Sequence, residues 1–337
     1  MNKKPETEAQ LAIYNEMARQ FKDSKASIDG AKEPAEKIAA SLRQTGRLLL
    51  LGMGGSHAVG RALEPLYRAS GIDAIAVPLS EQLGQPLPVD GRTIIVTSQS
   101  GESAEVLRWF RDCAPKDHVF GLTMEPNSSL AGLAPCLVGA GGSEIPFAAT
   151  RSLTVSAALH AAVLGALGQD LDDLFAILQG EPSIAIDEAV KALGDVNTVV
   201  TSSRQLQGVA EAIALGLTEL SRLPCFSLEG GQFRHGPVEM LGESVGVVLF
   251  RARDETCDLV TGFAEFVAET SSPLVVFDAS GKESIKGAIT VSCPSAQGLA
   301  AIFSVLPAAQ RFMVDFAASR VENVGTPLRC TKVTRVE

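Results

Sequence analysis

The sequence predicts an α/β protein with two tandem, doubly wound parallel sheets, each forming a flavodoxin-like three-layer sandwich. Three observations predict this class. Short apolar runs of strand length alternate with longer segments of helical periodicity. The runs end in turns rich in glycine or serine, as expected where a strand leads into a helix. The order strand, turn, helix occurs twice along the 337 residues with similar spacing, which indicates an internal duplication.

The first half begins with helices and continues as alternating strands and helices. Apolar residues recur at helical spacing from residue 6 to about residue 43, with a break marked by Gly30 and Pro34. Predicted strands follow at 48–51, 74–77, 93–96 and 119–122. Helices are expected after the turns 52–56 and 98–103, ending near residues 69 and 110.

The second half repeats this order after a helical connector at about 153–178 and a break at 180–182. Its predicted strands are 197–201, 245–250 and 274–278, with a helix ending near Ser221. The predicted organisation is a helical segment at 1–45, a first sheet domain at 46–180, a second at 181–325 and a C-terminal tail at 326–337.

Composition excludes several classes of partner. A net charge of −10 without a run dense in Lys or Arg argues against nucleic acid. The apolar stretches are interrupted before they reach the length of a membrane crossing, and the N-terminus has no apolar signal core. We therefore expect a cytoplasmic protein. The six cysteines are scattered singly, so no metal site is expected and the thiols should be reduced.

Two turns of the first half have the chemistry of a phosphate site. Backbone N–H groups at a helix N-terminus carry partial positive charge, and serine hydroxyls there can complete a cage around a phosphate dianion. The residues in question are Gly54, Gly55, Ser56, Ser98, Gln99, Ser100 and Ser103. The alternative is that these serines only cap helices. The corresponding turn of the second half, 251–254, lacks such residues, so one phosphate site per chain is expected.

The glycines of the first turn do not form a nucleotide motif. Gly52 and Gly54 begin a dinucleotide-binding pattern, but its third glycine would fall at His57, and Gly60 lies too late. No lysine follows the glycines as in a P-loop. No nicotinamide or nucleotide cofactor is therefore expected.

Four motifs, in order and at similar spacing, resemble the sugar isomerase (SIS) domain family. They are 98–103 (SQSGES), 142–150 (GSEI…AT), 233–237 (FRHGP) and 327–334 (PLRCTKVT). They are similar to the isomerase half of glucosamine-6-phosphate synthase and to stand-alone SIS-type deaminases. The resemblance extends from Arg47 to the C-terminus. It implies that the serine-rich loops hold a sugar phosphate.

The resemblance also implies a catalytic set in the second half and the tail. Glu219 matches the base that moves a proton between C1 and C2. His235 matches a histidine that opens the sugar ring and reaches into the partner subunit's site, which implies a homodimer with shared active sites. Lys332 matches a lysine that folds over the substrate and can form a Schiff base. By residue type alone, a solvated carboxylate, a structural histidine and a solvated terminal lysine are the alternatives.

Several residues depart from the synthase pattern. No glutaminase domain precedes Arg47, so the chain is not expected to release ammonia from glutamine. Gly216 replaces a lysine one helical turn before Glu219, Gln232 replaces a glutamate, and Ala149 replaces a serine. These positions surround C1 and the amino group of the sugar, so they bear on substrate and reaction direction.

The expected function is isomerising deamination of an amino-sugar 6-phosphate, most simply glucosamine 6-phosphate and water to fructose 6-phosphate and ammonia, without metal or redox cofactor. A fructosamine-6-phosphate deglycase, a galactosamine-6-phosphate deaminase and an aldose–ketose phosphate isomerase use the same site and stay open. A non-catalytic sugar-phosphate sensor is the alternative from another class, although it would not need Glu219, His235 and Lys332 together. Three further questions stay open. They are the configuration at C4 of the sugar, whether two chains or four assemble, and whether Lys332 acts covalently.

Overall fold

A computed structural model of the chain describes residues 6–180 and 185–335. They form two compact units, each made of separate stretches of sequence. The first-sheet unit comprises Glu16–Ile145, Ala149–Gln179 and the tail from Arg329. The second-sheet unit comprises the described residues up to Asn15, Pro146–Ala148 and the described part of Gly180–Leu328. Helix α1 (Glu8–Gly30) contributes to both units, and the tail groups with the first sheet.

The first sheet has five parallel strands in the order β2-β1-β3-β4-β5. They are β1 (Arg47–Gly52), β2 (Asp73–Pro78), β3 (Thr93–Thr97), β4 (Val119–Thr123) and β5 (Cys136–Val138). The central strands are buried along nearly their whole length, which explains why they read as continuous apolar runs rather than alternating ones.

Helices cover both faces of this sheet. They are α2 (Lys32–Thr45), α3 (Gly55–Ala69), the short helix η1 (Leu79–Leu83), α4 (Ala104–Asp112), α5 (Ser129–Leu133), α6 (Arg151–Ala166) and α7 (Asp172–Leu178). Leu49 and Leu51 of β1 pack with Trp109 of α4 and Leu130 of α5. Leu50, which points to the opposite face, lies against Gly60 of α3.

The second sheet repeats the topology of the first. Its strands are β6 (Thr198–Ser202), β7 (Cys225–Ser227), β8 (Val245–Ala252), β9 (Leu274–Ala279) and β10 (Ile289–Ser292), all parallel. Their order is β10-β9-β8-β6-β7. Read from the other end, β7-β6-β8-β9-β10, it matches the order β2-β1-β3-β4-β5 of the first sheet strand for strand. The predicted fold class, two tandem doubly wound parallel sheets, is confirmed.

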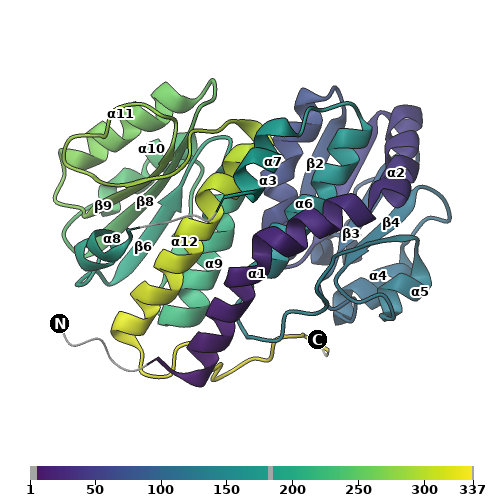
Figure 1. Cartoon of the computed structure of the whole chain (residues 1–337), viewed down its shortest axis with the longest axis horizontal. Helices are drawn as coiled ribbons and strands as arrows, with labels where there is room; N and C mark the ends of the chain where they lie inside the picture. Colours follow the sequence, from purple (N-terminus) through teal and green to yellow (C-terminus); the bar gives the residue numbers. More distant parts are fainter. Residues whose placement is uncertain (1–5, 181–184, 336–337) are drawn as a thin grey trace. The chain divides into compact units, whose positions relative to one another are not determined.

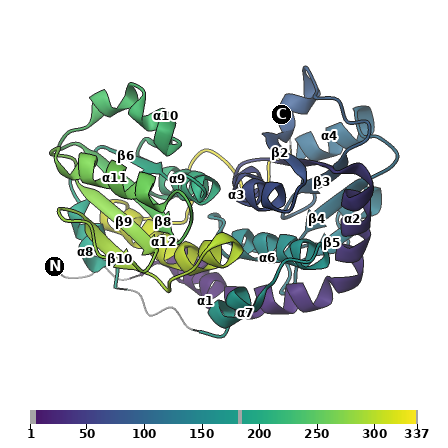
Figure 2. The ribbon, with the colours of Figure 1, turned by 90° about the horizontal axis from the view of Figure 1, so that it is seen from above.

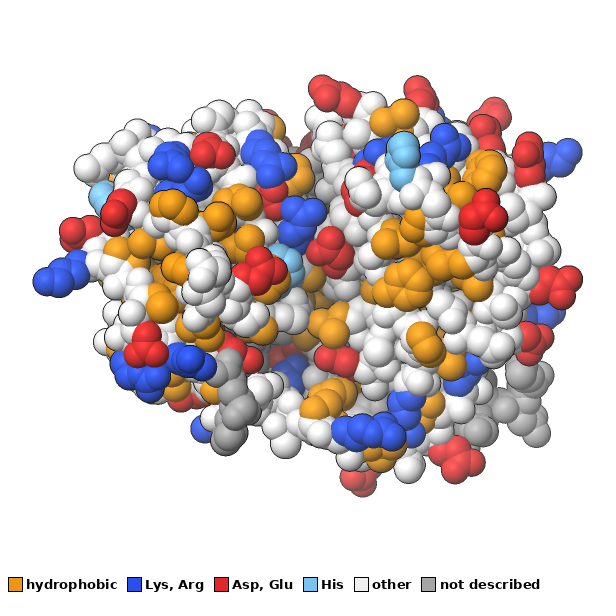
Figure 3. Space-filling model, turned by 180° about the vertical axis from the view of Figure 1, so that it is seen from behind, with side chains coloured by type: hydrophobic (Ala, Val, Ile, Leu, Met, Phe, Trp, Pro, Cys, Tyr) orange, Lys and Arg blue, Asp and Glu red, His pale blue; other side chains and the backbone are white. Residues whose placement is uncertain are grey.

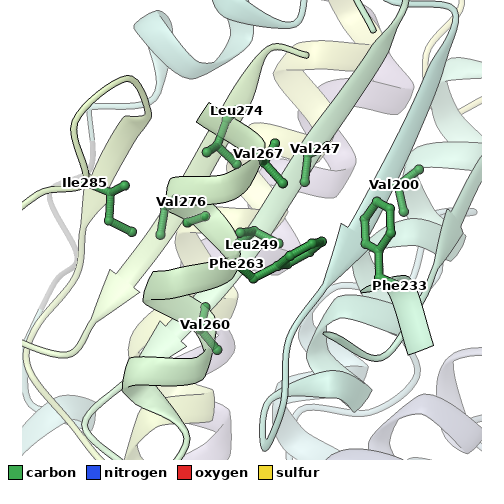
Figure 4. Packing of buried hydrophobic residues seen from close by; sticks show 11 residues of the cluster. Val200, Phe233, Val247, Leu249, Val260, Phe263, Val267, Leu274, Val276 and Ile285 are labelled. Carbon is green, nitrogen blue, oxygen red and sulfur yellow. The ribbon is translucent and has the colours of Figure 1, made fainter. Parts of the chain in front are cut away.

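The second sheet also lies between helical layers. Its helices are α8 (Asp187–Ala192), α9 (Gln207–Ser221), α10 (Gly230–Arg234), the short helix η2 (Pro237–Met240), α11 (Cys257–Ala268) and α12 (Gly298–Arg320). Figures 1 and 2 show α11 on one face of the strands and α12 on the other. Phe263 of α11 packs against Leu249 and Val276 on the first of these faces (Figure 4). On the other face, Phe277 of β9 contacts Phe312 of α12.

The structure adds elements that the sequence pattern does not predict. The edge strands β5, β7 and β10 have three or four residues with mixed burial, so they leave little periodic signal. The predicted connector is two helices, α6 and α7. The N-terminal helices divide at Ala31, and Pro34 lies in the first turn of α2, where proline is tolerated. The break predicted at 180–182 lies largely outside the described residues.

Among the described residues, one helix, α12, is long and apolar enough to cross a membrane by length and composition alone. Its most apolar stretch is 89% buried, however, as in the core helix of a folded domain. On the face of the molecule in Figure 3, Lys and Arg side chains are dispersed among acidic and neutral ones.

Candidate functional site

The loop between β3 and α4 presents several hydroxyl and amide groups at the carboxyl edge of the first sheet. Ser98 is buried, and its Oγ lies 3.3 Å from Oγ of Ser103 and accepts the Gly101 N–H at 3.2 Å. Ser100 Oγ accepts the Glu102 N–H at 3.2 Å. These bonds fold the loop back over the start of α4, so the serine-rich segment predicted to hold phosphate is a compact turn before a helix of nine residues.

Gly101 gives this loop its shape. Its φ of +65° lies in the left-handed region, and a Cβ there would lie 2.2 Å from Ser128 Oγ. Its N–H is bonded to Ser98 O, and its carbonyl accepts the Leu130 N–H at 3.1 Å. Glu102 accepts two further hydrogen bonds from Ser129. The loop is therefore held in one conformation by its neighbours.

Gln99 leaves a donor without a partner. Its carbonyl accepts hydrogen bonds from the Met124 N–H and Thr123 Oγ1. Its side-chain Nε2 is buried and has no hydrogen-bond partner within residues 6–180 and 185–335. A buried amide donor normally has an acceptor, so a ligand oxygen would satisfy it.

The glycine-rich turn after β1 leaves the same edge of the sheet. Gly52, the last residue of β1, pairs with Thr97 of β3, so the two loops begin on adjacent strands. Gly54 has φ +52° and precedes the first turn of α3. A Cβ on Gly55 would lie 2.9 Å from Leu153 Cδ2, so the helix approaches its neighbour closely here. Ser56, one of the residues predicted to hold phosphate, occupies the first turn of α3.

His57 follows Ser56 in the first turn of α3, and the sequence motifs do not predict a role for it. Burial lowers the pKa of its imidazole below the ordinary value, and the nearby charge of Arg61 lowers it further. Its Nδ1 is buried without a hydrogen-bond partner among the described residues. The ring is therefore favoured in its neutral form beside the loop.

The tail brings Lys332 to the same unit as the serine loops. The Ala104 N–H, at the first residue of α4, donates to the Thr334 carbonyl at 3.0 Å. Lys332 Nζ lies 3.4 Å from Oε2 of Glu144, and its side chain is only 21% exposed. A lysine near the chain end is thus packed rather than solvated.

Glu219 and His235 lie in the second-sheet unit. Glu219 is in the last turn of α9, half-buried. His235 directly follows α10 and is exposed, and the next residue, Gly236, has φ +113°. A residue with a side chain would be strained at Gly236, which accounts for the glycine in the motif. The roles of both residues stay predictions.

Gly216 explains one departure from the synthase pattern. It is buried on α9 facing α12, and a Cβ there would lie 2.1 Å from Met313 Sδ. A lysine at this position would have to displace Met313. Gln232 is exposed on α10. The Cβ of Ala149 lies 3.7 Å from the position that a Cβ on Gly55 would take.

The carboxyl edge of the second sheet has different chemistry. Asp254 accepts hydrogen bonds from the N–H and Oγ1 of Thr256 just before α11, so a carboxylate already occupies this helix start. Arg251 of β8 is buried in a bidentate pair with Asp278 of β9. Burial opposes ionisation of Asp278, but hydrogen bonds from Arg251 and Ser280 hold its pKa below the ordinary value. A phosphate would meet negative charge here.

Within residues 6–180 and 185–335, no group of three His, Cys, Asp or Glu side chains is arranged to hold a metal ion. No disulfide joins the six cysteines, which are all free thiols.

No protein-family model matches the chain. Among curated proteins, it is 24% identical over 349 residues to a rat glutamine–fructose-6-phosphate aminotransferase [isomerizing] 1, covering 94% of this chain and 49% of that protein. It is 21% identical to an Aquifex aeolicus enzyme of the same name, covering 96% and 58%. The chain thus spans about half the length of the curated relatives it matches.

Solved structures decide the fold. The C-terminal domain of the Francisella tularensis glucosamine-fructose-6-phosphate aminotransferase superposes with a TM-score of 0.80 at 19% identity, covering 94% of this chain and 98% of that one. The tagatose-6-phosphate ketose/aldose isomerase of Escherichia coli gives 0.77 at 19% identity, covering 98% and 100%. The chain has the phosphosugar isomerase fold. The glucosamine-6-phosphate deaminase of Thermotoga maritima shares it, with a TM-score of 0.71 at 18% identity, covering 92% and 99%.

Proposed function

We propose that the chain is a sugar-phosphate enzyme of the isomerase and deaminase type, and that it converts an amino-sugar 6-phosphate and water to a ketose 6-phosphate and ammonia. The phosphate binds at the loops after β1 and β3, where Ser56, Ser98, Ser100 and the Gln99 amide supply donors. His235 opens the ring, Glu219 transfers the C2 proton to C1, and hydrolysis of the resulting ketimine releases ammonia.

One observation carries this proposal. The first-sheet unit combines two glycine- and serine-rich helix starts on adjacent strands, an unpartnered buried amide at Gln99, and a packed tail lysine at Lys332. A phosphate dianion matches the helix starts and the amide, and a sugar carbonyl matches the amine. The second-sheet unit offers a carboxylate at the comparable helix start, which argues for one phosphate site per chain.

Deamination rather than amination is supported by the residues that depart from the aminotransferases. The buried glycine at 216 and the exposed glutamine at 232 stand where the resemblance expects a lysine and a glutamate around the amino group. An aldose–ketose phosphate isomerase is the second candidate, because the Escherichia coli isomerase superposes better than the Thermotoga maritima deaminase.

The test is a coupled assay on the purified chain. Glucosamine 6-phosphate should release ammonia and fructose 6-phosphate in equal amounts, and a Glu219→Gln variant should bind the substrate without turnover. Ketose formation from an aldose phosphate, without ammonia from any amino-sugar phosphate, would favour the second candidate. A sensor would be favoured if the wild-type chain turned over no sugar phosphate and both it and the Glu219→Gln variant still bound one.

We also propose a homodimer in which His235 completes the partner's site, in keeping with its exposed position after α10. Mixing two inactive variants, His235→Ala and Ser98→Ala, should restore part of the activity, because a mixed dimer can form one intact site. Activity that stays absent after mixing, with mixed dimers detected, would contradict a shared site.

A further inference from the structure

We propose that Glu144 is a positioning residue for Lys332: its buried carboxylate holds the tail amine beside the phosphate loops and keeps the tail docked before substrate arrives. The inference rests on the proposed function for its catalytic consequence, but the docking itself does not. Nothing in the residue types predicts it, because Glu144 and Lys332 are 188 positions apart.

Glu144 is an unusually enclosed carboxylate. The residue is 1% exposed. Its Oε1 accepts hydrogen bonds from the Thr150 N–H at 2.9 Å, Thr150 Oγ1 at 2.7 Å and the Arg151 N–H at 2.8 Å. Its Oε2 accepts from Ser152 Oγ. These donors lie at the start of α6, whose 16 residues place a positive dipole end against the carboxylate. The carboxylate is therefore held in one orientation.

The loop that carries Glu144 is equally constrained. The buried guanidinium of Arg151 donates to the carbonyls of Ala140 at 3.1 Å and Gly142 at 2.6 Å. The same guanidinium is paired with Glu16 and Asp23 of α1, so its charge is already balanced. Arg151 fixes the loop without serving as counter-ion to Glu144.

Lys332 supplies that counter-ion. A buried carboxylate needs a cation or several donors to offset its lost hydration, and the ammonium at 3.4 Å is the charged partner that faces Oε2. The contact with Glu144 fixes the amine near the start of α6. The hydrogen bond from the Ala104 N–H to the Thr334 carbonyl fixes the tail backbone at the start of α4. Two anchors of different chemistry thus hold the tail on the phosphate-binding unit.

A merely structural role is the alternative, since Glu144 would stabilise the start of α6 without any lysine nearby. The two roles differ in what the tail does. If Glu144 only caps α6, its replacement lowers stability and leaves the tail in place. If it positions Lys332, its replacement and that of Lys332 release the tail to the same extent.

The experiment measures hydrogen exchange of the free protein in the tail and at the Ala104 amide, for Glu144→Gln, Lys332→Gln and the double variant. Arg329→Gln is the matched control, because it removes a tail charge from an exposed side chain. We expect both single variants to speed exchange at least about tenfold, the double variant to add little, and the control to match wild type. Unchanged tail exchange in Lys332→Gln would overturn the proposal. The Lys332 side chain is near the surface, so this variant should fold even if Glu144→Gln does not.

Kinetics then test the catalytic consequence with the substrate that the wild-type chain turns over. Both single variants should lower kcat, Lys332→Gln at least as much as Glu144→Gln, with KM changed less than about threefold. The double variant should lose little more than Lys332→Gln alone. Multiplicative losses would mean that the two residues act independently and would overturn positioning. If the wild type turns over no sugar phosphate, the proposed function fails while the exchange result still decides whether the tail is docked.

Discussion

Substituting Gly101 with alanine tests how far the phosphate loop depends on a single backbone position. A Cβ at 101 would lie 2.2 Å from Ser128 Oγ and 2.4 Å from Ser128 Cβ, both far inside contact distance. Alanine at φ +65° costs about 1–2 kcal/mol. Displacing Ser128, which accepts the Ala131 N–H at the start of α5, costs about 1 kcal/mol more. The free energy of unfolding should therefore fall by about 2–3 kcal/mol.

The same substitution should weaken phosphate binding, because a shifted residue 101 carries Ser98 and Ser100 out of position. Chemical denaturation gives the stability, and calorimetric titration with a sugar 6-phosphate gives the affinity. Gly132→Ala is the matched control: it lies in the adjacent α5, has no atom within 4 Å of the added Cβ, and should be neutral or slightly stabilising. If Gly101→Ala matched Gly132→Ala in both stability and affinity, the preorganised loop would be refuted.

Three further predictions concern packing and charge. Burial lowers the pKa of His160 to about 4, so the unfolded chain binds a proton there at a higher pH than the folded chain does. Between pH 7.5 and 5, wild type should therefore lose about 2 kcal/mol of stability that His160→Gln does not lose. Equal losses in the two proteins would contradict this. Gly216→Ala should destabilise by about 1–2 kcal/mol through the clash with Met313, and adding Met313→Ala should remove the clash; a single variant as stable as wild type would disprove close helix approach. Arg251→Met should cost about 3–5 kcal/mol by leaving Asp278 buried alone, whereas the double variant with Asp278→Leu should regain most of it; denaturation curves without that recovery would count against the pair.

The sequence predicts those parts of the fold whose signals are local. Strands β1 and β3 are continuous apolar runs because helices cover both their faces. Edge strand β7 has three partly exposed residues, so no run of buried residues marks it. The doubled topology follows from the repeated order of elements, but the strand order within each sheet comes from pairing between distant segments.

The candidate site divides in the same way. The serine loop was predictable because a strand, a glycine and several hydroxyls lie within a few residues of one another. The unpartnered amide of Gln99 depends on side-chain packing, which no motif encodes. The contact of Lys332 with Glu144 joins residues from opposite parts of the chain, so only the three-dimensional structure brings it to light. The motif around Glu144 marked the loop without indicating its partner.

Calorimetric titration of wild type and Ser100→Ala with glucitol 6-phosphate and with unphosphorylated glucitol tests most directly whether the helix starts of the first sheet bind a phosphate dianion. Glucitol 6-phosphate has no carbonyl, so it reports on the phosphate site without turnover. We predict binding of the phosphorylated ligand alone, weakened at least about tenfold in Ser100→Ala by loss of a hydrogen bond to a charged group. Equal affinity for both ligands, or for both proteins, would contradict the phosphate site.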